Sequence, residues 1–287
     1  MGKPAGRYAR WLAGCLLLLT AACAALPTPA DRLARAGGLA AARGWRPLSV
    51  PTAEFDLLAF VPGAQMSGDV LTIYIEGDGL AWLSPSHPAP DPTPRDPLGL
   101  RLALAQPGGN AAYLGRPCQY VDVRRRGCES RYWTSARFAP EVIAATSQAI
   151  DALKRRFGAR RLTLVGYSGG GAVAALVAAR REDVARLVTV AGNLDHGAWT
   201  RLHRGDPLTG SLDAVDEAGR LRAIPQWHFV GAKDDNVTPE LVRGFASRFP
   251  PERRPVVEVV PGFDHRCCWA EAWPELVARI RGVDSGP

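Results

Sequence analysis

From residue 69 to the end of the chain, short apolar runs alternate with stretches of helical periodicity. The apolar runs predict strands over residues 70–75, 111–114, 161–165, 187–190, 227–230 and 256–260. Helical periodicity predicts helices over residues 141–157, 169–181 and 270–281. Because most connections are long enough to cross back over a sheet, successive strands can run parallel. The alternation therefore predicts an α/β fold with a mostly parallel central sheet flanked by helices. We expect an antiparallel pair of strands within residues 46–62 to precede the parallel strands.

Two segments interrupt this alternation. Residues 83–97 are dense in Pro, Ser and Asp, which predicts an irregular loop. Residues 192–225 form a longer excursion between two expected strands. Connections of this length are usually functional or disordered.

The N-terminus has the pattern of an export signal. Lys3, Arg7 and Arg10 precede an apolar stretch from Trp11 to Leu26. This stretch is short for a membrane span and is interrupted by glycine and cysteine. We therefore predict that residues 1–22 are a signal peptide.

Two leader cysteines are candidates for lipidation. Cys15 has the better local motif but almost no apolar run before it, whereas Cys23 follows the full leucine run and two small residues. We predict an acyl anchor on Cys23, with simple cleavage and release as the alternative. Residues 23–44 would then be a tether and residues 45–287 the folded domain, exported to the bacterial cell envelope on the periplasmic side or secreted.

Charge gives little support for a polyanionic partner. The net charge is +7, and removal of the leader's three cationic residues leaves about +4, spread over the remaining chain. A dispersed charge of this size is a weak argument for electrostatic capture of nucleic acid. We expect no nucleic-acid partner and no cofactor.

Four cysteines remain after the leader: Cys118, Cys128, Cys267 and Cys268. An even number in an exported chain favours disulfides over a metal site, and no Cys or His pairs have zinc-site spacing. We predict a bond between Cys118 and Cys128, because they enclose a polar, Arg-rich loop. Such a bond contributes roughly 2.5–3 kcal/mol in the chain-entropy treatment. A bond between Cys267 and Cys268, and crossed pairs such as Cys118 with Cys268, stay open.

The segment Gly166-Tyr167-Ser168-Gly169-Gly170 joins an expected strand to an expected helix. A serine hydroxyl is a poor nucleophile that needs a base, free approach and nearby charge stabilisation. A sharp strand-to-helix turn exposes the hydroxyl, and the helix directs its positive end at the site. Ser168 is therefore the candidate nucleophile, and a purely structural Gly-rich turn is the alternative.

A base and an acid follow Ser168 in the chain. Asp234 comes just after the expected strand ending at residue 230, and His265 comes just after the last strand. Catalytic groups gather at the carboxyl ends of strands in open α/β sheets. His265 would take the proton of Ser168, while Asp234 would orient the imidazole. Asp235 is the main rival for the acid.

Together, residues 166–170, 231–239 and 262–265 resemble the α/β-hydrolase superfamily, over about residues 45–281. In that family, a loop after an early strand supplies one backbone N–H of the oxyanion hole. The resemblance implies that Asp78 supplies this N–H and Gly169 the second. Glu76 stands where His is common. A carboxylate at position 78 would be costly beside a developing oxyanion unless it points away.

The resemblance implies a serine hydrolase that cleaves carboxylic ester or thioester bonds of a small-molecule substrate through an acyl-enzyme. It also implies that residues 192–225, with residues 83–97, form a cap over the site, because family insertions leave from the carboxyl ends of strands. A serine peptidase or acyltransferase uses the same triad. A non-catalytic envelope binding protein on a hydrolase scaffold is an alternative from a different class.

Overall fold

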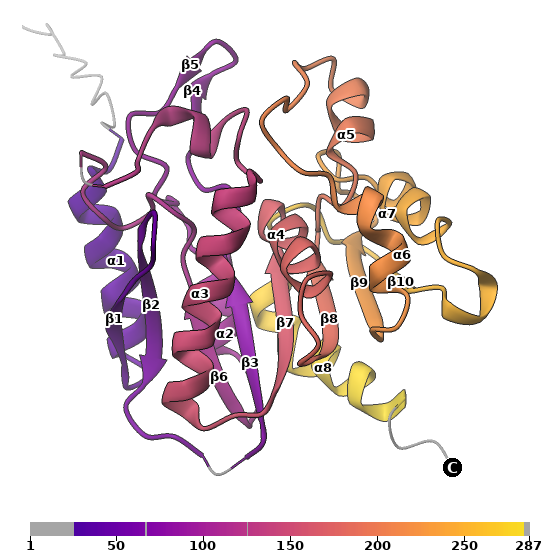
Figure 1. Cartoon of the computed structure of the whole chain (residues 1–287), viewed down its shortest axis with the longest axis horizontal. Coiled ribbons are helices and arrows are strands. Elements are labelled where there is room, and N and C mark those ends of the chain that lie inside the picture. The colour runs from indigo at the N-terminus through magenta and orange to yellow at the C-terminus, as the bar shows by residue number, and fades with distance from the viewer. Residues whose placement is uncertain (1–25, 67, 125, 284–287) are drawn as a thin grey trace, which may run out of the picture.

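The structure, a computed structural model, describes residues 26–66, 68–124 and 126–283, and has a central sheet with helices on both faces (Figure 1). The strands are β1 (Trp45–Pro51), β2 (Asp56–Pro62), β3 (Val70–Ile75), β4 (Trp82–Ser84), β5 (His87–Pro88), β6 (Asn110–Leu114), β7 (Arg161–Tyr167), β8 (Val184–Val190), β9 (Gln226–Gly231) and β10 (Val256–Val260). The α-helices are α1 (Pro29–Ala41), α2 (Leu98–Leu104), α3 (Pro140–Phe157), α4 (Gly169–Ala178), α5 (His196–Leu202), α6 (Ala218–Leu221), α7 (Pro239–Ala246) and α8 (Trp269–Val283). Short 3₁₀ helices are η1 (Ser130–Trp133), η2 (Ala214–Glu217) and η3 (Pro251–Arg253).

Eight strands form the main sheet, in the order β1-β2-β6-β3-β7-β8-β9-β10. β1 and β2 pair antiparallel, β2 pairs antiparallel with β6, and all pairs from β6 to β10 are parallel. The parallel strands therefore end at one edge of the sheet, which we call the carboxyl edge. The opposite edge is the amino edge. The predicted α/β fold with a mostly parallel sheet is confirmed.

Two hydrophobic layers hold the sheet between the helices. The layer on one face includes side chains of α3 and α4, and the layer on the other face includes side chains of α1, α2 and α8. Helix α3 shows why the sequence forms these elements. Pro140 occupies its first turn, Lys154 to Arg156 its last, and Gly158 ends it with φ 62°.

The predicted tether is wrong from residue 29 onward, because α1 is part of the folded body. Thr28 and Asp31 form a capping box at its start, and Ala36 and Ala40 are fully buried. The predicted signal peptide and Cys23 lie outside the described residues. Within the described ranges, no helix is both long and apolar enough to cross a membrane.

The two interrupting segments are more ordered than their composition predicts. Residues 83–97 contribute to the β4–β5 hairpin, which stands at the carboxyl edge (Figure 1). Residues 192–225 divide into two parts. The first part, with α5, stays at the carboxyl edge, whereas η2 packs against α4 and leads through α6 back to the start of β9. Only the first part is placed where the predicted cap would lie.

Candidate active site

Ser168 sits in the turn between β7 and α4, with φ 51° and ψ −122°. This backbone conformation is rare for residues with a side chain and is common at functional turns. A Cβ on Gly166 would lie 2.2 Å from the carbonyl oxygen of Gly170, so the turn requires glycine there. The backbone of Ser168 is held by its N–H to Val190 (3.0 Å) and by its carbonyl, which accepts from Asn193 (3.1 Å).

The structure brings the three predicted side chains together from three loops. His265 Nε2 lies 3.0 Å from Ser168 Oγ, and His265 Nδ1 lies 2.9 Å from Asp234 Oδ2. The Asp234 side chain is completely buried, and its Oδ1 also accepts the backbone N–H of Val237 at 2.8 Å. Asp235, the rival acid, is exposed. In this arrangement the imidazole can accept a proton on one nitrogen while a carboxylate holds the other.

Sequence reasoning missed Asn236, two residues after Asp234. Its Nδ2 lies 3.1 Å from His265 Nε2, and Trp199 Nε1 donates to its Oδ1 at 3.1 Å. The amide thus links α5 to the imidazole. The sequence indicated Asn236 only by its position in the same loop as Asp234.

The loop of His265 is held by hydrogen bonds from its backbone N–H groups to the side chain of Asp264. Asp264 Oδ1 accepts the N–H groups of Cys267 and Arg266, each at 2.7 Å. These hydrogen bonds lower the pKa of the Asp264 carboxyl below its usual value. Tyr167, next to Ser168, donates its hydroxyl to the carbonyl of His265 at 3.2 Å. The nucleophile turn and the imidazole loop are therefore tied directly to each other.

Gly169 and Asp78 are the two residues whose backbone N–H groups were predicted to form the oxyanion hole. Gly169 is the first residue of α4, where helical N–H groups lack an intrahelical partner. Asp78 follows the carboxyl end of β3. Within the described ranges, neither N–H donates a hydrogen bond to another backbone group outside regular elements.

The Asp78 carboxylate does not point away from this site. A Cβ on Gly169 would lie 2.0 Å from Asp78 Oδ1, so the carboxylate lies directly against the start of α4. Two guanidinium groups bind it: Arg137 at 2.7 Å and Arg116 at 3.2 Å. Both arginines are buried, and Arg116 also donates to the carbonyl of Arg137. Sequence spacing gave no signal for this cluster, because Arg116 and Arg137 are 38 and 59 residues from Asp78.

The two arginines explain how a carboxylate is tolerated at position 78, beside the expected oxyanion site. Burial by itself raises the pKa of the Asp78 carboxyl, but the charges and hydrogen bonds of Arg137 and Arg116 outweigh burial, and the pKa is lowered. Asp78 therefore stays ionised, with two positive charges around it.

A family model described as the alpha/beta hydrolase fold matches residues 111–253. The chain belongs to the α/β-hydrolase superfamily. Solved structures agree in fold. Est1E from Butyrivibrio proteoclasticus has a TM-score of 0.57 at 14% identity, over 82% of this chain and 99% of that one. The Pyrococcus furiosus esterase Pf2001 has a TM-score of 0.57 at 15% identity, over 84% and 91%.

An alpha-beta serine hydrolase homologue from Coxiella burnetii has a TM-score of 0.55 at 18% identity, over 83% of this chain and 97% of that one. No curated protein matches the sequence at a significant level. At these identities the likeness concerns the fold. The fold and its esterase neighbours support a hydrolase.

In this α/β hydrolase, the side chain of Glu76 binds backbone groups on both sides of the loop that carries Asp78. Its fully buried carboxylate accepts the N–H groups of Gly77 (3.0 Å) and Gly99 (3.1 Å) and the hydroxyl of Tyr113 (3.0 Å). Burial raises the pKa of Glu76 to about 7, although these hydrogen bonds act in the opposite direction. A titratable group thus lies directly under the loop that carries a candidate oxyanion donor.

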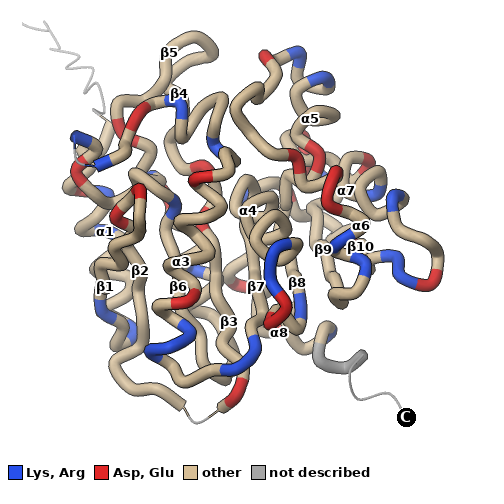
Figure 2. Tube along the Cα trace, viewed as in Figure 1, with Lys and Arg blue, Asp and Glu red and all other residues tan. Residues whose placement is uncertain are grey.

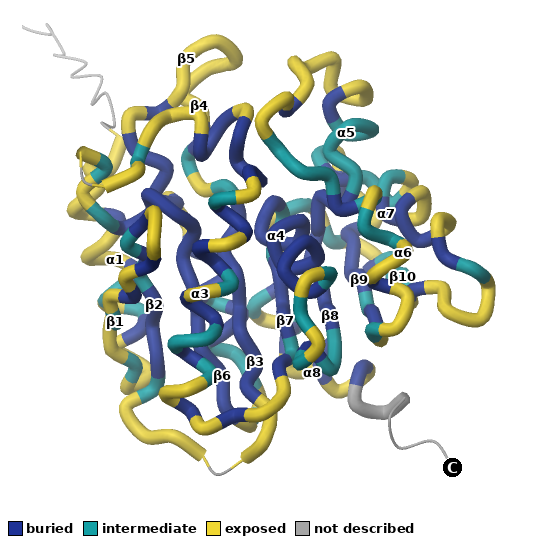
Figure 3. The backbone as a smooth tube through the Cα atoms, viewed as in Figure 1, coloured by how far each residue is buried: buried dark blue, intermediate teal, exposed yellow. Residues whose placement is uncertain are grey.

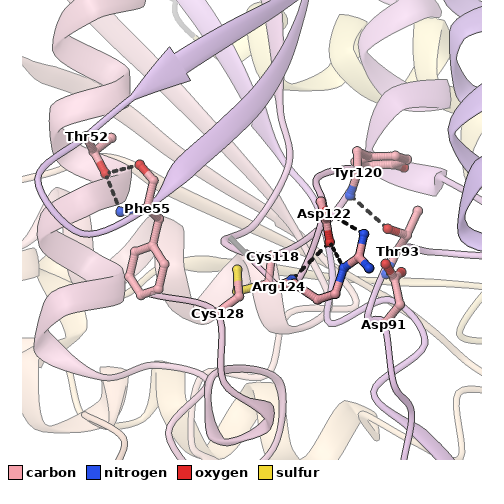
Figure 4. The surroundings of a disulfide bond; sticks show 9 residues. All are labelled: Thr52, Phe55, Asp91, Thr93, Cys118, Tyr120, Asp122, Arg124 and Cys128. Carbon is pink, nitrogen blue, oxygen red and sulfur yellow. Dashed lines mark hydrogen bonds and ion pairs between the residues drawn. A yellow bond between two sulfur atoms is a disulfide. The ribbon is translucent and has the colours of Figure 1, made fainter. Parts of the chain in front are cut away.

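The hydrolase has a disulfide between Cys118 and Cys128, with the Cα atoms 5.5 Å apart (Figure 4). Cys118 is followed by Gln119, whose side-chain amide donates to the carbonyl of Gly77 at 2.9 Å. The disulfide therefore closes the loop that braces the Asp78 segment. Cys267 is bonded to Cys268, so the structure does not contain the crossed pairing.

Proposed function

We propose that this hydrolase is a serine hydrolase that cleaves carboxylic ester or thioester bonds of small acyl substrates through an acyl-enzyme. The proposal rests on two contacts of one imidazole: His265 Nδ1 lies 2.9 Å from Asp234 Oδ2, and His265 Nε2 lies 3.0 Å from Ser168 Oγ. A buried carboxylate, an imidazole and a hydroxyl in this order are what nucleophilic acyl transfer requires.

In the acylation step, Ser168 Oγ attacks the acyl carbonyl carbon while His265 Nε2 takes the hydroxyl proton. Asp234 accepts the Nδ1–H hydrogen bond and stabilises the imidazolium without taking the proton. The carbonyl oxygen becomes an oxyanion, which the N–H groups of Asp78 and Gly169 bind. His265 then donates its proton to the departing alcohol or thiol, and the acyl group stays on Ser168.

In the deacylation step, water attacks the acyl carbon and His265 Nε2 takes a proton from that water. The second oxyanion uses the same two N–H groups. Collapse returns the proton to Ser168 Oγ and releases the carboxylic acid. Removing one oxyanion donor in such sites costs about 10²–10³ in kcat.

The paired guanidinium groups support this assignment of the oxyanion donors. An unpaired carboxylate at Asp78 would repel the developing oxyanion through a poorly screened environment. Arg137 and Arg116 bind both carboxylate oxygens, at 2.7 and 3.2 Å, so the cluster as a whole carries a positive charge. The local field then favours negative charge on the substrate oxygen.

The test uses a fluorophosphonate probe and a panel of nitrophenyl esters and thioesters of increasing acyl length. We expect the probe to label Ser168 in the wild type, and Ser168→Ala to lose labelling and at least about 10³-fold in kcat/KM while remaining folded. Ser247→Ala, at an exposed serine after α7, is the matched control. Labelling without ester or thioester cleavage would reject the substrate class, and a folded wild type that does not label would reject the serine mechanism.

A further inference from the structure

We propose that the carboxyl edge of the sheet docks onto an anionic phospholipid bilayer through the β4–β5 hairpin and the exposed end of α5, and that the substrate is an acyl lipid of that bilayer. The docking surface comprises Trp82, Leu83, Leu202 and Leu26. Only the substrate assignment rests on the proposed serine hydrolase activity.

The hairpin presents apolar side chains without charge. Trp82 and Leu83 are 40% and 50% exposed, and every residue from 82 to 88 is exposed (Figure 3). Residues 79–90 contain no Asp, Glu, Lys or Arg, and the trace of the hairpin is tan in Figure 2. Single exposed apolar residues are ordinary, but an uncharged, protruding segment with adjacent Trp and Leu is typical of an interaction site. Tryptophan in particular favours the interface of a bilayer.

The hairpin is anchored at its base and so holds these side chains outward. Ala81 and Ala89 are buried and joined by a backbone hydrogen bond of 3.0 Å. Trp133 Nε1 donates to the carbonyl of Ala89 at 2.9 Å, and Leu80 N–H donates to Pro92 at 3.0 Å. The exposed tip is therefore presented by a fixed base.

The end of helix α5 exposes a further apolar side chain, which is flanked by cationic residues. Leu202 is 51% exposed, and its neighbours Arg201 and Arg204 are also exposed. Asp206 is the one acidic residue in the exposed stretch 201–206. Apolar residues flanked by arginine suit a surface of anionic headgroups above acyl chains. Trp199 on the same helix reaches Asn236 beside His265, so this end of α5 adjoins the active site.

The chain also enters the fold at the carboxyl edge. Arg32, in the first turns of α1, pairs with Asp91 in the loop beyond the hairpin at 3.1 Å. Leu26, the first described residue, is 48% exposed. Cys23, the predicted acyl-anchor site, is three residues earlier, a separation of at most about 11 Å in extended chain. An acyl group on Cys23 would hold this edge, and not the amino edge, against the headgroups.

This orientation determines the substrate class. Ser168 lies at the same edge as the hairpin and α5, because it follows the carboxyl end of β7. An acyl chain can then pass from the bilayer to the nucleophile with little exposure to water. A docked active site therefore favours lipid esters in the bilayer over esters free in solution.

The first experiment measures orientation independently of catalysis. Full-length Ser168→Ala protein is incubated with phosphatidylcholine vesicles with and without phosphatidylglycerol, and amide hydrogen exchange is followed by mass spectrometry. We expect the phosphatidylglycerol vesicles to slow exchange in residues 80–90 and 200–205 and to leave residues 63–70 and 252–256 unchanged. Protection of the amino-edge segments instead, or of neither set, would overturn the docking proposal.

The second experiment measures substrate class with catalytic Ser168 present. Trp82→Glu combined with Leu83→Glu is compared with Met66→Glu combined with Val256→Glu, a control pair that is 58% and 43% exposed at the amino edge. We expect the hairpin pair to lose about tenfold or more in hydrolysis of vesicle phospholipid, because two apolar contacts are lost. Hydrolysis of a soluble nitrophenyl ester should stay near wild type in both pairs.

If the two pairs of substitutions lose vesicle phospholipid hydrolysis equally, or if neither pair loses it, the substrate assignment is overturned. A wild type that cleaves neither substrate would instead contradict the proposed function, and the exchange experiment would still decide the docking. Wild-type cleavage of the soluble ester without cleavage of vesicle phospholipid would overturn the lipid substrate alone.

Discussion

The side-chain amide of Asn236 points its Nδ2 at Nε2 of His265, at 3.1 Å. The indole of Trp199 donates to Oδ1 of the same amide, so the NH₂ group must face the imidazole. An N–H donor opposite Nε2 favours the ring with a lone pair on that nitrogen. This is the form that can accept the proton of Ser168.

We therefore expect Asn236→Asp to move the acid limb of the kcat/KM profile to higher pH by about one unit or more. The new carboxylate would face His265 beside Asp234, and an adjacent negative charge stabilises the protonated ring. The pH dependence of nitrophenyl ester hydrolysis measures the shift. Asp235→Asn, at the exposed neighbouring position, should leave the profile unchanged. An unshifted profile in Asn236→Asp would reject this role for the amide.

Replacing Arg137 tests the charge balance around Asp78. We expect Arg137→Met to reduce kcat/KM by about 10²-fold, because the carboxylate beside Gly169 loses its shorter ion pair. Breaking one partner of a buried ion pair also destabilises the fold, by about 3 kcal/mol. Steady-state kinetics and urea unfolding measure the two effects.

The rescue variant distinguishes electrostatics from packing at this cluster. Adding Asp78→Asn to Arg137→Met removes the uncompensated charge, and we expect it to recover most of the lost kcat/KM. The backbone N–H of residue 78 is retained in both variants. A double variant as slow as Arg137→Met would mean that arginine acts through packing alone.

Glu76 makes the stability of the fold depend on pH. Its folded-state pKa of about 7 is above its ordinary value of 4.5, so the folded protein holds a proton that the unfolded chain releases. This group therefore destabilises the fold increasingly as pH rises from about 4.5 to 7, by an amount on the order of 3 kcal/mol.

We expect Glu76→Gln to lose less free energy of unfolding than the wild type between pH 5 and pH 8. Glutamine imitates the protonated carboxyl: its oxygen accepts from Gly77 and Gly99, and its amide donates to Tyr113. Urea unfolding at the two pH values provides the measurement, with the exposed Glu252→Gln as control. If both variants follow the wild-type pH dependence, Glu76 is not the responsible group.

The two disulfides should contribute unequally to stability. We expect Cys118→Ser with Cys128→Ser to lower the free energy of unfolding by roughly 2.5–3 kcal/mol, because the bond closes a loop with a sequence separation of 10. Cys267→Ser with Cys268→Ser should cost less, because adjacent residues enclose almost no chain. Urea unfolding of both double variants compares them, and an equal or reversed order would reject the loop-entropy explanation.

The fold and the convergence of Ser168, Asp234 and His265 could be predicted because their signals are local. Hydrophobic periodicity reports which side of each element is buried, and the spacing of apolar runs is enough to predict a parallel sheet. The turn at Ser168 needs glycine within two residues on either side. Asp234 and His265 each follow a strand directly, and the strand ends meet at one edge in any parallel sheet.

Tertiary structure decided everything that depends on contacts between distant residues. Asp234 and Asp235 are equivalent in sequence, and only the course of the loop buries one carboxylate and exposes the other. The carboxylate of Asp78 is tolerated because folding brings Arg116 and Arg137 to it from a separate loop. Pair interactions of this kind leave no periodic trace along the chain, since the energy of an ion pair depends on distance and burial and not on sequence separation.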